Sequence, residues 1–525
     1  MGERRTSARA AGLPPLVRDL TDPSAYPHRP RSVRLIQTHI SWVFLAGEYA
    51  YKVKKPVELG FLDFRTLGQR RRFCAEEVRL NRRLAPDTYL GVVEIKRADG
   101  GYRLAGRGRT AEVAVWMRRL PAKRMLDRLV EAGEADGVLL ERIGHVVADF
   151  HAVAAHGPAI HRYGSAAVIR GNWRENFAQT RHLPADILPP EWRRAIEAYV
   201  ARFLADEARR LTARARAGRI RDCHGDLHAQ HVCCTDPIRI FDCIEFNARF
   251  RYGDTASEIA FLAMDLEARG RPDLAIDFLN SYLDGSGDYD AVPLLDFYRA
   301  YRAYVRGKVY GIQAFEPNRS DTRALADQAR RYFELAAAST EPRRRVELVV
   351  MTGLVASGKT TVARALARAG AGIVVRTDAV RKQLAGLPWS RRAPAAFGEG
   401  LYTAAMTRHT YATCLRIADA LLGAGWPVII DGTFGRREER DAARAVARRR
   451  RAPFRIVWCQ APDAELRARL RARAAAGGDI SDAGEAVLQA QRPVYQAPEG
   501  EANVERPGSE ARHEAGRAAG IKLAG

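Results

Sequence analysis

Residues 353–360 read GLVASGKT and fit the pattern G-x4-G-K-[ST], which binds the phosphates of a nucleotide. The glycines let the backbone fold into a nest of N–H donors, and the helix that follows adds positive partial charge at its N-terminus. In such a loop the lysine bridges the β- and γ-phosphates and the threonine hydroxyl is a ligand of Mg²⁺. The sequence therefore predicts a nucleotide site of Gly353, Ser357, Gly358, Lys359, Thr360 and Thr361.

Two acids and two arginines follow this loop at useful positions. Asp431 ends the apolar run WPVIID, where a carboxylate can hold Mg²⁺ through water. Asp378 ends IVVRTD, and it either holds the hydroxyl that accepts a phosphoryl group or caps the next helix; both roles can hold together. Arg469 and Arg473 share a helix face at spacing i, i+4 and form either a lid over the phosphates or a solvated face.

A second set of chemical residues lies upstream. The segment HGDLH contains Asp226 and is followed by a short strand, a turn and a second strand that ends in Asp242. Protein kinases arrange a catalytic acid and a metal-binding acid across such a hairpin. A β-rich region offers Lys52 and Lys54, and a helix offers Glu77, so that a lysine–glutamate pair can position phosphates. The alternative is that these lysines belong to a basic β-turn.

The elements that must position these residues change along the chain. Short β-rich runs and one helical stretch fill residues 33–120, helices dominate up to about residue 340, and strands then alternate with helices. Such alternation predicts a parallel sheet covered by helices. We expect a loosely held polar extension, a first domain, a linker and a second domain, with the boundaries 1–30, 31–335, 336–345 and 346–525.

The motifs GLVASGKTT, RTDAVRK and VIIDGTF resemble those of P-loop kinases of the gluconate kinase and zeta-toxin type. The stretches THISWVFLAGEYAYKVKKPVELGFLDF, HGDLH and IFDCIEFNARFRYGD resemble the aminoglycoside phosphotransferase family. The whole chain is similar to bacterial proteins that fuse these two domains. The resemblance implies an α+β kinase-like bilobal domain, followed by an α/β P-loop NTPase domain of the AAA family ATPase kind with a parallel sheet, and ATP and Mg²⁺ as cofactors.

The resemblance also implies roles for single residues in the first domain. Asp226 would orient the acceptor hydroxyl, Asp242 would be a Mg²⁺ ligand, and Lys52, or Lys54 two residues on, would contact phosphate with Glu77 as partner. The chain departs from the kinase pattern at His231, which stands where a kinase has asparagine for the second Mg²⁺. An imidazole can bind a metal but matches hard Mg²⁺ less well than a carbonyl oxygen does.

Composition narrows the class of protein. Among 525 residues, 47% are hydrophobic and 28% charged, as in globular proteins, and no apolar run is long enough to span a membrane. The net charge of +23 comes from 85 basic and 62 acidic residues, but no nucleic-acid motif accompanies it, so we expect solvated helix faces and no nucleic-acid partner. Seven cysteines without an export signal indicate a reduced, cytoplasmic protein whose thiols are buried, rather than a zinc site.

These observations favour an ATP-dependent phosphotransferase with two nucleotide sites and a small-molecule hydroxyl acceptor. The alternative is an ATP-binding regulatory protein, in which the P-loop domain is an ATPase switch and the kinase-like domain a degenerate sensor. A polycationic aminoglycoside would need an acidic pocket, and the acids that could form one stand among many arginines: Asp254, Glu258, Asp265 and Glu267. The acceptor and the oligomeric state stay open.

Overall fold

The computed structural model describes residues 13–507 except 61, 99, 316–320, 342–343, 371, 392–399, 477–479 and 481–483, and it describes residues 473–476 by their backbone alone. The described chain divides into two compact units. The first takes its residues from 1–134, 154–164 and 215–254, and the second from 135–153, 165–214 and 255–525.

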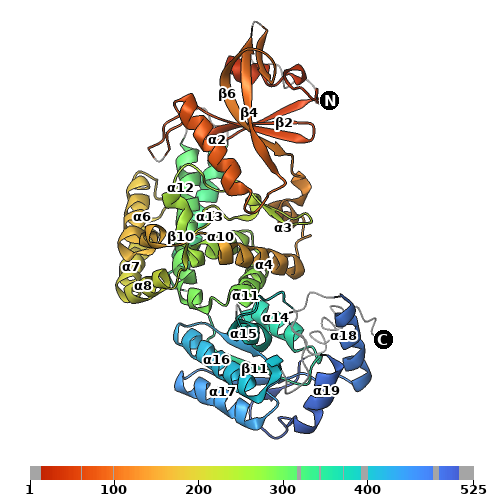
Figure 1. The fold of residues 1–525 in the computed structure, drawn as a ribbon. Coiled ribbons are helices and arrows are strands. Elements are labelled where there is room, and N and C mark those ends of the chain that lie inside the picture. The colour runs from red at the N-terminus through yellow and green to blue at the C-terminus, as the bar shows by residue number, and fades with distance from the viewer. Residues whose placement is uncertain are drawn as a thin grey trace. The chain divides into compact units, whose positions relative to one another are not determined.

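An antiparallel sheet with the strand order β1-β2-β3-β6-β4-β5 forms the frame of the first unit (Figure 1). Its strands are rich in β-branched and aromatic residues, which fit a half-buried pleated surface. The strand bounds are Val33–Gln37, Ser41–Ala46, Tyr49–Lys54, Tyr89–Ala98, Gly101–Leu104 and Arg109–Arg118 for β1 to β6. In β3, Lys52 and Lys54 are two residues apart and therefore point to the same face.

Helix α2, Leu67–Asn81, packs against β4 and β6. A capping box starts it: the Thr66 hydroxyl accepts from the Gln69 backbone N–H, and the Gln69 side chain accepts from the Thr66 N–H. Cys74 and Val78 of this helix lie in one buried cluster with strand residues of β6. This packing fixes the helix face that also carries Glu77.

The expected loosely held extension is instead packed over its described residues. Helix α1, Pro15–Asp19, is short, but Val17 and Leu20 are fully buried in a core that includes strand residues of the sheet. The Tyr26 hydroxyl donates a 2.7 Å hydrogen bond to the Leu20 carbonyl oxygen. The polar and proline-rich composition hid an apolar i, i+3 pair that one helical turn aligns. Residues 1–12 lie outside the described residues.

A short hairpin in the first unit carries the predicted acids. Strands β8, Val232–Cys233, and β9, Arg239–Ile240, pair antiparallel, with Asp226 on the loop before them and Asp242 two residues after β9. The order acid, strand, turn, strand, acid is therefore the one expected from the sequence. Further elements of this region are α3 (Leu126–Glu131), α5 (Pro158–His161), β7 (Ile220–Asp222), α9 (Ala248–Arg251) and β10 (Tyr252–Asp254).

The second unit begins with helices. Helix α10, Thr255–Ala268, is buried from Thr255 to Leu266, which makes it the core helix of this part. Helix α4 packs against α11, and α12 packs against both α10 and α13. The remaining helices are α4 (Gly137–Val153), α6 (Ala166–Gln179), α7 (Pro190–Asp206), α8 (Ala208–Arg216), α11 (Pro272–Ser286), α12 (Leu295–Ala314) and α13 (Thr322–Ala338).

The second unit ends in a five-stranded sheet whose strands are all parallel, in the order β12-β13-β11-β14-β15. This confirms the predicted parallel sheet. Strand β11, Leu348–Thr352, lies in the middle and is buried throughout. The other bounds are α14 (Lys359–Gly370), β12 (Ile373–Arg376), α15 (Thr377–Leu384), α16 (Ala404–Gly423), β13 (Val428–Asp431), α17 (Arg437–Arg449), β14 (Phe454–Trp458), α18 (Asp463–Ala476), α19 (Glu485–Gln491) and β15 (Val504–Glu505).

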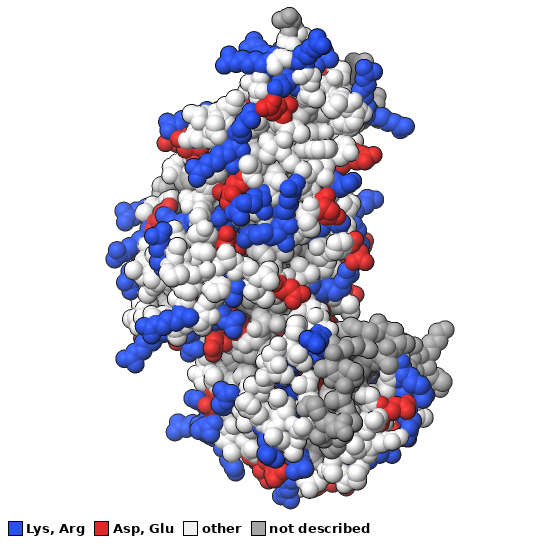
Figure 2. Space-filling view, viewed as in Figure 1, with Lys and Arg blue, Asp and Glu red and all other residues white. Residues whose placement is uncertain are grey.

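Figure 2 shows how the basic side chains are distributed on one face of the molecule. On the face drawn in Figure 2, lysines and arginines are scattered with acidic side chains among them. Several arginines are paired with acids; Arg449 and Arg450, for example, both donate to Asp419. No helix in the described ranges has both the length and the apolar character needed to cross a bilayer.

Candidate active sites

The first candidate site is built around a lysine–glutamate pair. Lys52 on β3 lies 2.9 Å from Glu77 on α2, measured from Nζ to Oε1, and Lys54 lies 2.7 Å from the other oxygen of the same carboxylate. Lys54 is fully buried and also contacts Glu245, whereas Lys52 is 12% exposed and reaches Asp242 at 2.5 Å. The structure therefore brings both predicted lysines to Glu77, but only Lys52 faces the acid after the hairpin.

These contacts keep both Lys52 and Asp242 in their charged forms. Burial alone would lower the pKa of Lys52, but the carboxylates of Asp242 and Glu77 raise it well above its usual value. Burial would raise the pKa of Asp242, but the Lys52 ammonium holds it well below its usual value. A charged lysine beside a charged aspartate is the state needed to bind a metal–phosphate complex.

The loop that carries Asp226 is held by His224. The Asp226 N–H donates to His224 Nδ1 at 3.3 Å, and His224 Nε2 donates to the Phe241 carbonyl oxygen at 2.9 Å. One neutral tautomer makes both bonds, since Nδ1 accepts while Nε2 carries the proton. Gly225 has a φ of +87°, and a Cβ there would meet the Phe250 carbonyl oxygen at 2.9 Å. The conformation of this loop thus depends on two consecutive residues: His224, through its two hydrogen bonds, and Gly225, through its positive φ.

Asp242 is held in place from its backbone. Its φ of +63° is in the left-handed region, which non-glycine residues seldom adopt and which is found at functional sites. Its N–H donates to the Tyr89 hydroxyl at 3.1 Å, and the next N–H, of Cys243, donates to Asn81 Oδ1 at 2.8 Å. These bonds aim the carboxylate at Lys52 and at His231, whose Nε2 lies 3.6 Å from Asp242 Oδ2.

The second candidate site is the glycine-rich loop between β11 and α14. Gly353 has a φ of +141°, and a Cβ there would meet the Cys459 carbonyl oxygen at 2.2 Å, so only glycine fits. Lys359 Nζ donates to the carbonyl oxygens of Gly353 and Leu354, at 3.0 and 2.8 Å. Ser357 Oγ is buried without a hydrogen-bond partner. A ring of backbone with a lysine across it and an unsatisfied hydroxyl fits a bound phosphate.

The structure brings together Thr360 and Asp431, the two residues predicted to bind a metal at this loop. The Thr360 hydroxyl donates a 2.7 Å hydrogen bond to Asp431 Oδ2, and Asp431 is the last residue of β13. A hydroxyl and a carboxylate are hard oxygen donors, which fit Mg²⁺. Thr361, the other predicted residue here, follows Thr360 in the first turn of α14.

Comparison with known proteins gives a family match for each of the two parts of the chain. Residues 61–295 match the family described as Phosphotransferase enzyme family, and residues 348–498 match the AAA domain. The uncharacterized protein Rv2004c of Mycobacterium tuberculosis is 36% identical over 457 residues, which are 87% of this chain and 89% of that protein. The chain belongs to this family. In this chain a phosphotransferase domain is followed by a P-loop domain of the kinase type.

Two solved structures are also similar to parts of the chain. A gluconokinase from Sinorhizobium meliloti 1021 is 22% identical, with a TM-score of 0.23, over 34% of this chain and 94% of that one. A choline/ethanolamine kinase family protein from Mesorhizobium loti is 14% identical, with a TM-score of 0.36, over 60% of this chain and 95% of that one. The family matches and the phosphate loop identify the chain as an ATP-using phosphotransferase of two domains.

In the P-loop domain, Asp378 is not the helix cap that the sequence allowed. Helix α15 begins at Thr377 and its capping position is Arg376, so Asp378 is the second residue of the first turn. The alternative of a helix cap is therefore contradicted, because the last residue of β12, Arg376, is itself the capping position. Asp378 is half-buried, which leaves part of its carboxylate available, and its charge suits the N-terminal end of the helix.

Arg469 is not on a solvated face. Its guanidinium is 11% exposed, donates to the Ala356 carbonyl oxygen of the phosphate loop at 3.1 Å, and pairs with Glu465 on its own helix. Arg469 therefore touches the phosphate loop directly. The side chain of Arg473 lies outside the described residues, so the predicted pairing of the two arginines stays a prediction.

Sequence reasoning missed two residues beside the metal end of the P-loop site. Arg376 lies 3.7 Å from Asp431 and 3.4 Å from Asp284, a buried residue of α11. Burial raises the pKa of Asp284 to about 7, and Arg376 opposes this only in part. Asp284 Oδ1 is buried without a hydrogen-bond partner. An arginine at the end of an apolar strand was the only sequence signal, and Asp284 is too far along the chain to be linked to it.

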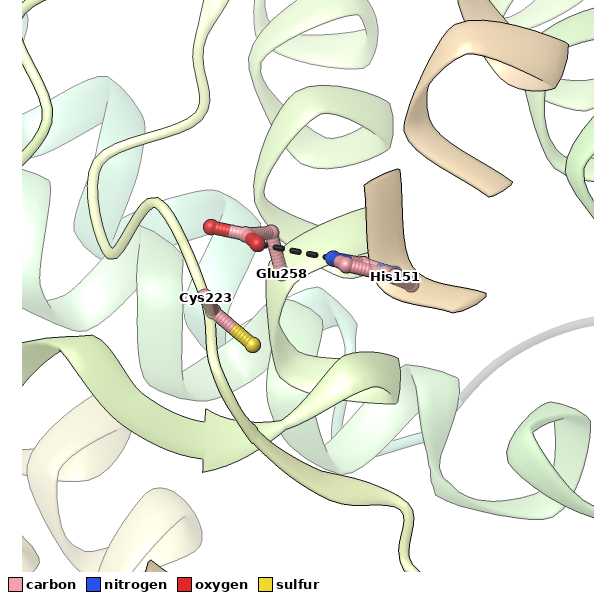
Figure 3. Close-up of side chains that lie close together, drawn as sticks. All are labelled: His151, Cys223 and Glu258. Atoms are coloured by element: carbon pink, nitrogen blue, oxygen red, sulfur yellow. Dashed lines mark hydrogen bonds and ion pairs between the residues drawn. The ribbon is translucent and has the colours of Figure 1, made fainter. Parts of the chain in front are cut away.

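Three of the four acids that could form an acidic acceptor pocket make contacts within the fold: Glu258, Asp265 and Glu267. Glu258 on α10 hydrogen-bonds to His151 on α4 at 2.8 Å, and both side chains are buried (Figure 3). Asp265 accepts from the Tyr332 hydroxyl at 2.9 Å and is fully buried, and Glu267 pairs with Arg299. These three acids stabilise the helices and do not line an open pocket.

All seven cysteines are free and buried. This agrees with the expectation of buried thiols. Among the described residues, Cys233, Cys234 and Cys243 belong to no group of histidines, cysteines and acids close enough to hold a metal. The histidines near them do form such a group, but with Asp226.

Proposed function

We propose that the protein transfers the γ-phosphoryl group of ATP to hydroxyl groups of small molecules at two separate sites, with Mg²⁺ or a related divalent ion as cofactor. The observation that supports the proposal is similar in each domain: a side chain that would bind either phosphate or the metal already contacts the acid that would hold the metal. In the phosphotransferase domain Lys52 contacts Asp242 at 2.5 Å, and in the P-loop domain Thr360 contacts Asp431 at 2.7 Å.

In the phosphotransferase domain, Lys52 would neutralise charge on the phosphates while Glu77 keeps the ammonium in position. Asp226 is 33% exposed on its loop, so its carboxylate can accept the hydrogen bond of an acceptor hydroxyl and then its proton. Asp242 would hold the divalent ion, which bridges phosphate oxygens and offsets their charge. Lys54, being fully buried behind Lys52, would support the site and not touch nucleotide.

In the P-loop domain, the backbone of the glycine loop would enclose the β-phosphate. The ammonium of Lys359 now caps two loop carbonyls, and it would move from them to the β- and γ-phosphates when nucleotide enters. Thr360 and Asp431 would hold Mg²⁺, and Arg469 would add positive charge from α18. The half-buried Asp378 would hold the acceptor hydroxyl.

The test is a screen of hydroxyl-bearing metabolites with ATP labelled at the γ-position, run on full-length variants with one site silenced. Asp226→Asn should abolish label transfer at the first site and leave ATP binding nearly intact, while Lys359→Ala should silence the second. Asp87→Asn is the matched control, because this half-exposed aspartate pairs with Arg239 outside either site. Label transfer that persists in the double variant Asp226→Asn/Lys359→Ala would refute both assignments.

A second candidate function is supported by His231. Its presence where a kinase has asparagine favours a domain that binds nucleotide and regulates the P-loop ATPase without transferring phosphate. In that case Asp226→Asn would change neither label transfer nor the products, while Lys52→Ala would change the rate of ATP hydrolysis by the P-loop domain. The two-site phosphotransferase predicts the opposite pair of results.

A further inference from the structure

The imidazole of His231 has one defined tautomer in this structure. His231 Nδ1 lies 2.9 Å from the backbone carbonyl oxygen of Asp226. A carbonyl oxygen only accepts, so Nδ1 carries the proton and the lone pair of a neutral ring is on Nε2. Histidines that bind metals are usually oriented in this way, with the second ring N–H donated to a carbonyl or carboxylate.

The lone pair of His231 faces another acceptor. Nε2 lies 3.6 Å from Asp242 Oδ2, while Oδ1 of the same carboxylate is taken by Lys52. Two acceptors that face each other across this distance form no hydrogen bond, but they can share a cation. Two ligands bound about 2.1 Å from one ion are about 3.0–3.4 Å apart, so a small closure of the pair would admit an ion.

Further donors surround this pair. Asp226 Oδ2 lies 3.5 Å from His231 Nδ1 and 3.5 Å from His228 Nε2, and one ligand atom from each of these three residues falls within 4.8 Å of the others. The rings of His228 and His231 lie against each other, with centroids 4.1 Å apart. The histidines are mostly buried, whereas the side chains of Asp226 and Asp242 are 33% and 40% exposed. The cluster is thus open on its carboxylate side, where phosphate oxygens would complete a coordination shell.

The donor set points away from Mg²⁺. Magnesium takes oxygen ligands almost exclusively, whereas imidazole suits the first-row transition metals, and Mn²⁺ accepts both imidazole and carboxylate. We propose that the phosphotransferase domain binds a divalent transition-metal ion through His231 Nε2 and Asp242 Oδ2, with Asp226 beside it, and prefers such an ion to Mg²⁺. The inference deepens the proposed function of this site, on which it rests for the position of the nucleotide, but binding of the ion itself needs no phosphoryl transfer.

The probe is Mn²⁺, added to the full-length protein without nucleotide and in the presence of a large excess of Mg²⁺. Electron paramagnetic resonance counts free and bound Mn²⁺, and electron spin-echo modulation detects a nitrogen ligand directly. We expect one Mn²⁺ per chain that resists Mg²⁺ and shows coupling to an imidazole nitrogen. A wild-type protein whose Mn²⁺ shows no nitrogen coupling, or that loses Mn²⁺ to Mg²⁺, would overturn the proposal.

Three variants assign the site. His231→Asn should remove the nitrogen coupling and weaken Mn²⁺ at least about tenfold, while restoring the oxygen donor that suits Mg²⁺. Asp242→Asn should weaken Mn²⁺ with the His231–Asp226 hydrogen bond intact, which guards against a loss due to misfolding; circular dichroism checks the fold of each. His182→Asn is the control, since this exposed histidine lies on the helical part of the chain. Unchanged coupling in His231→Asn would refute the ligand assignment.

The same measurements separate this inference from the proposed function. Nitrogen-coupled Mn²⁺ in a protein that transfers no label at the first site would support the proposed metal site and refute the proposed enzyme activity. Label transfer that depends on Asp226 and is fastest with Mg²⁺, in a protein without nitrogen-coupled Mn²⁺, would support the proposed activity and refute the proposed metal site.

Discussion

Lys52 and Lys54 both bind the carboxylate of Glu77, one at each oxygen, although only Lys52 also reaches Asp242. The two lysines therefore divide the work of one ion-pair network. Lys52 is the side chain placed to meet phosphate, and Lys54 holds the buried glutamate that positions it. This division leads to opposite expectations for the two lysine substitutions.

Lys52→Ala should abolish nucleotide binding at the first site with a small effect on stability, because the side chain is partly exposed. Lys54→Ala should lower the free energy of unfolding by about 3–5 kcal/mol, because it leaves the carboxylates of Glu77 and Glu245 buried without their shared cation. Denaturant unfolding and nucleotide titration measure the two effects. Lys55→Ala is the control for both, because Lys55 directly follows Lys54 but donates to the Thr38 carbonyl oxygen at the surface. Equal loss of stability from Lys52→Ala and Lys54→Ala would contradict the division of roles.

Arg469 provides a test of the P-loop site. Arg469→Ala should raise the KM for ATP by about tenfold at the P-loop site, because a charged hydrogen bond to the loop is worth about 1.5–3 kcal/mol and the charge near the phosphates is lost. Among the described residues, Arg467 on the same helix pairs with Asp463 and Glu485 at the surface, so Arg467→Ala should leave KM unchanged. Steady-state ATP hydrolysis in an Asp226→Asn background measures this site alone. A KM that responds equally to both substitutions would place Arg469 outside the site.

Asp284 should make stability depend on pH. Burial raises the pKa of this acid to about 7 in the folded chain, above its usual value of 3.8, so the folded state binds the proton more tightly. The contribution of Asp284 to the free energy of unfolding is therefore fully present below about pH 4 and is lost as the pH rises through about 7. The loss is on the order of 4 kcal/mol at most. Asp284→Asn should melt at a higher temperature than the wild type at pH 8, and the difference should shrink toward pH 4.

The control for Asp284 lies on the same helix. Asp273 is part-exposed and its pKa is lowered by a hydrogen bond from Arg271, so Asp273→Asn should give no gain at pH 8. Calorimetric melts at pH 4, 6 and 8 compare the three proteins. Parallel melting curves for the wild type and Asp284→Asn at all three values would show that the carboxyl is not protonated in the folded chain.

Motifs with a fixed local geometry could be predicted from the sequence. The phosphate loop needs glycine at positive φ and a lysine where the next helix begins, and residues 353–360 contain both in that order. The hairpin from Asp226 to Asp242 was also readable, because its strands and turn are consecutive. By contrast, whether Lys52 or Lys54 meets phosphate depends on Asp242, which is 190 residues away along the chain.

Features that depend on packing between residues far apart in the chain could not be predicted from the sequence. Val17 and Leu20 lie in a segment whose polar composition predicts an extension, and only the sheet residues packed against them show that they belong to a core. The Arg376–Asp284 contact joins a strand end to a helix 92 residues earlier, and no local pattern marks it. His231 was recognised as a departure from the kinase pattern, but its tautomer follows from a backbone carbonyl that only the folded loop brings to Nδ1.

The most direct test of the two-site account is the number of nucleotides bound per chain. Isothermal titration calorimetry with a non-hydrolysable ATP analogue and divalent ion should give two bound nucleotides per chain in the wild type and one in each of Lys359→Ala and Lys52→Ala. The double variant Lys52→Ala/Lys359→Ala should bind none. A wild-type chain that binds one nucleotide or none would contradict the account.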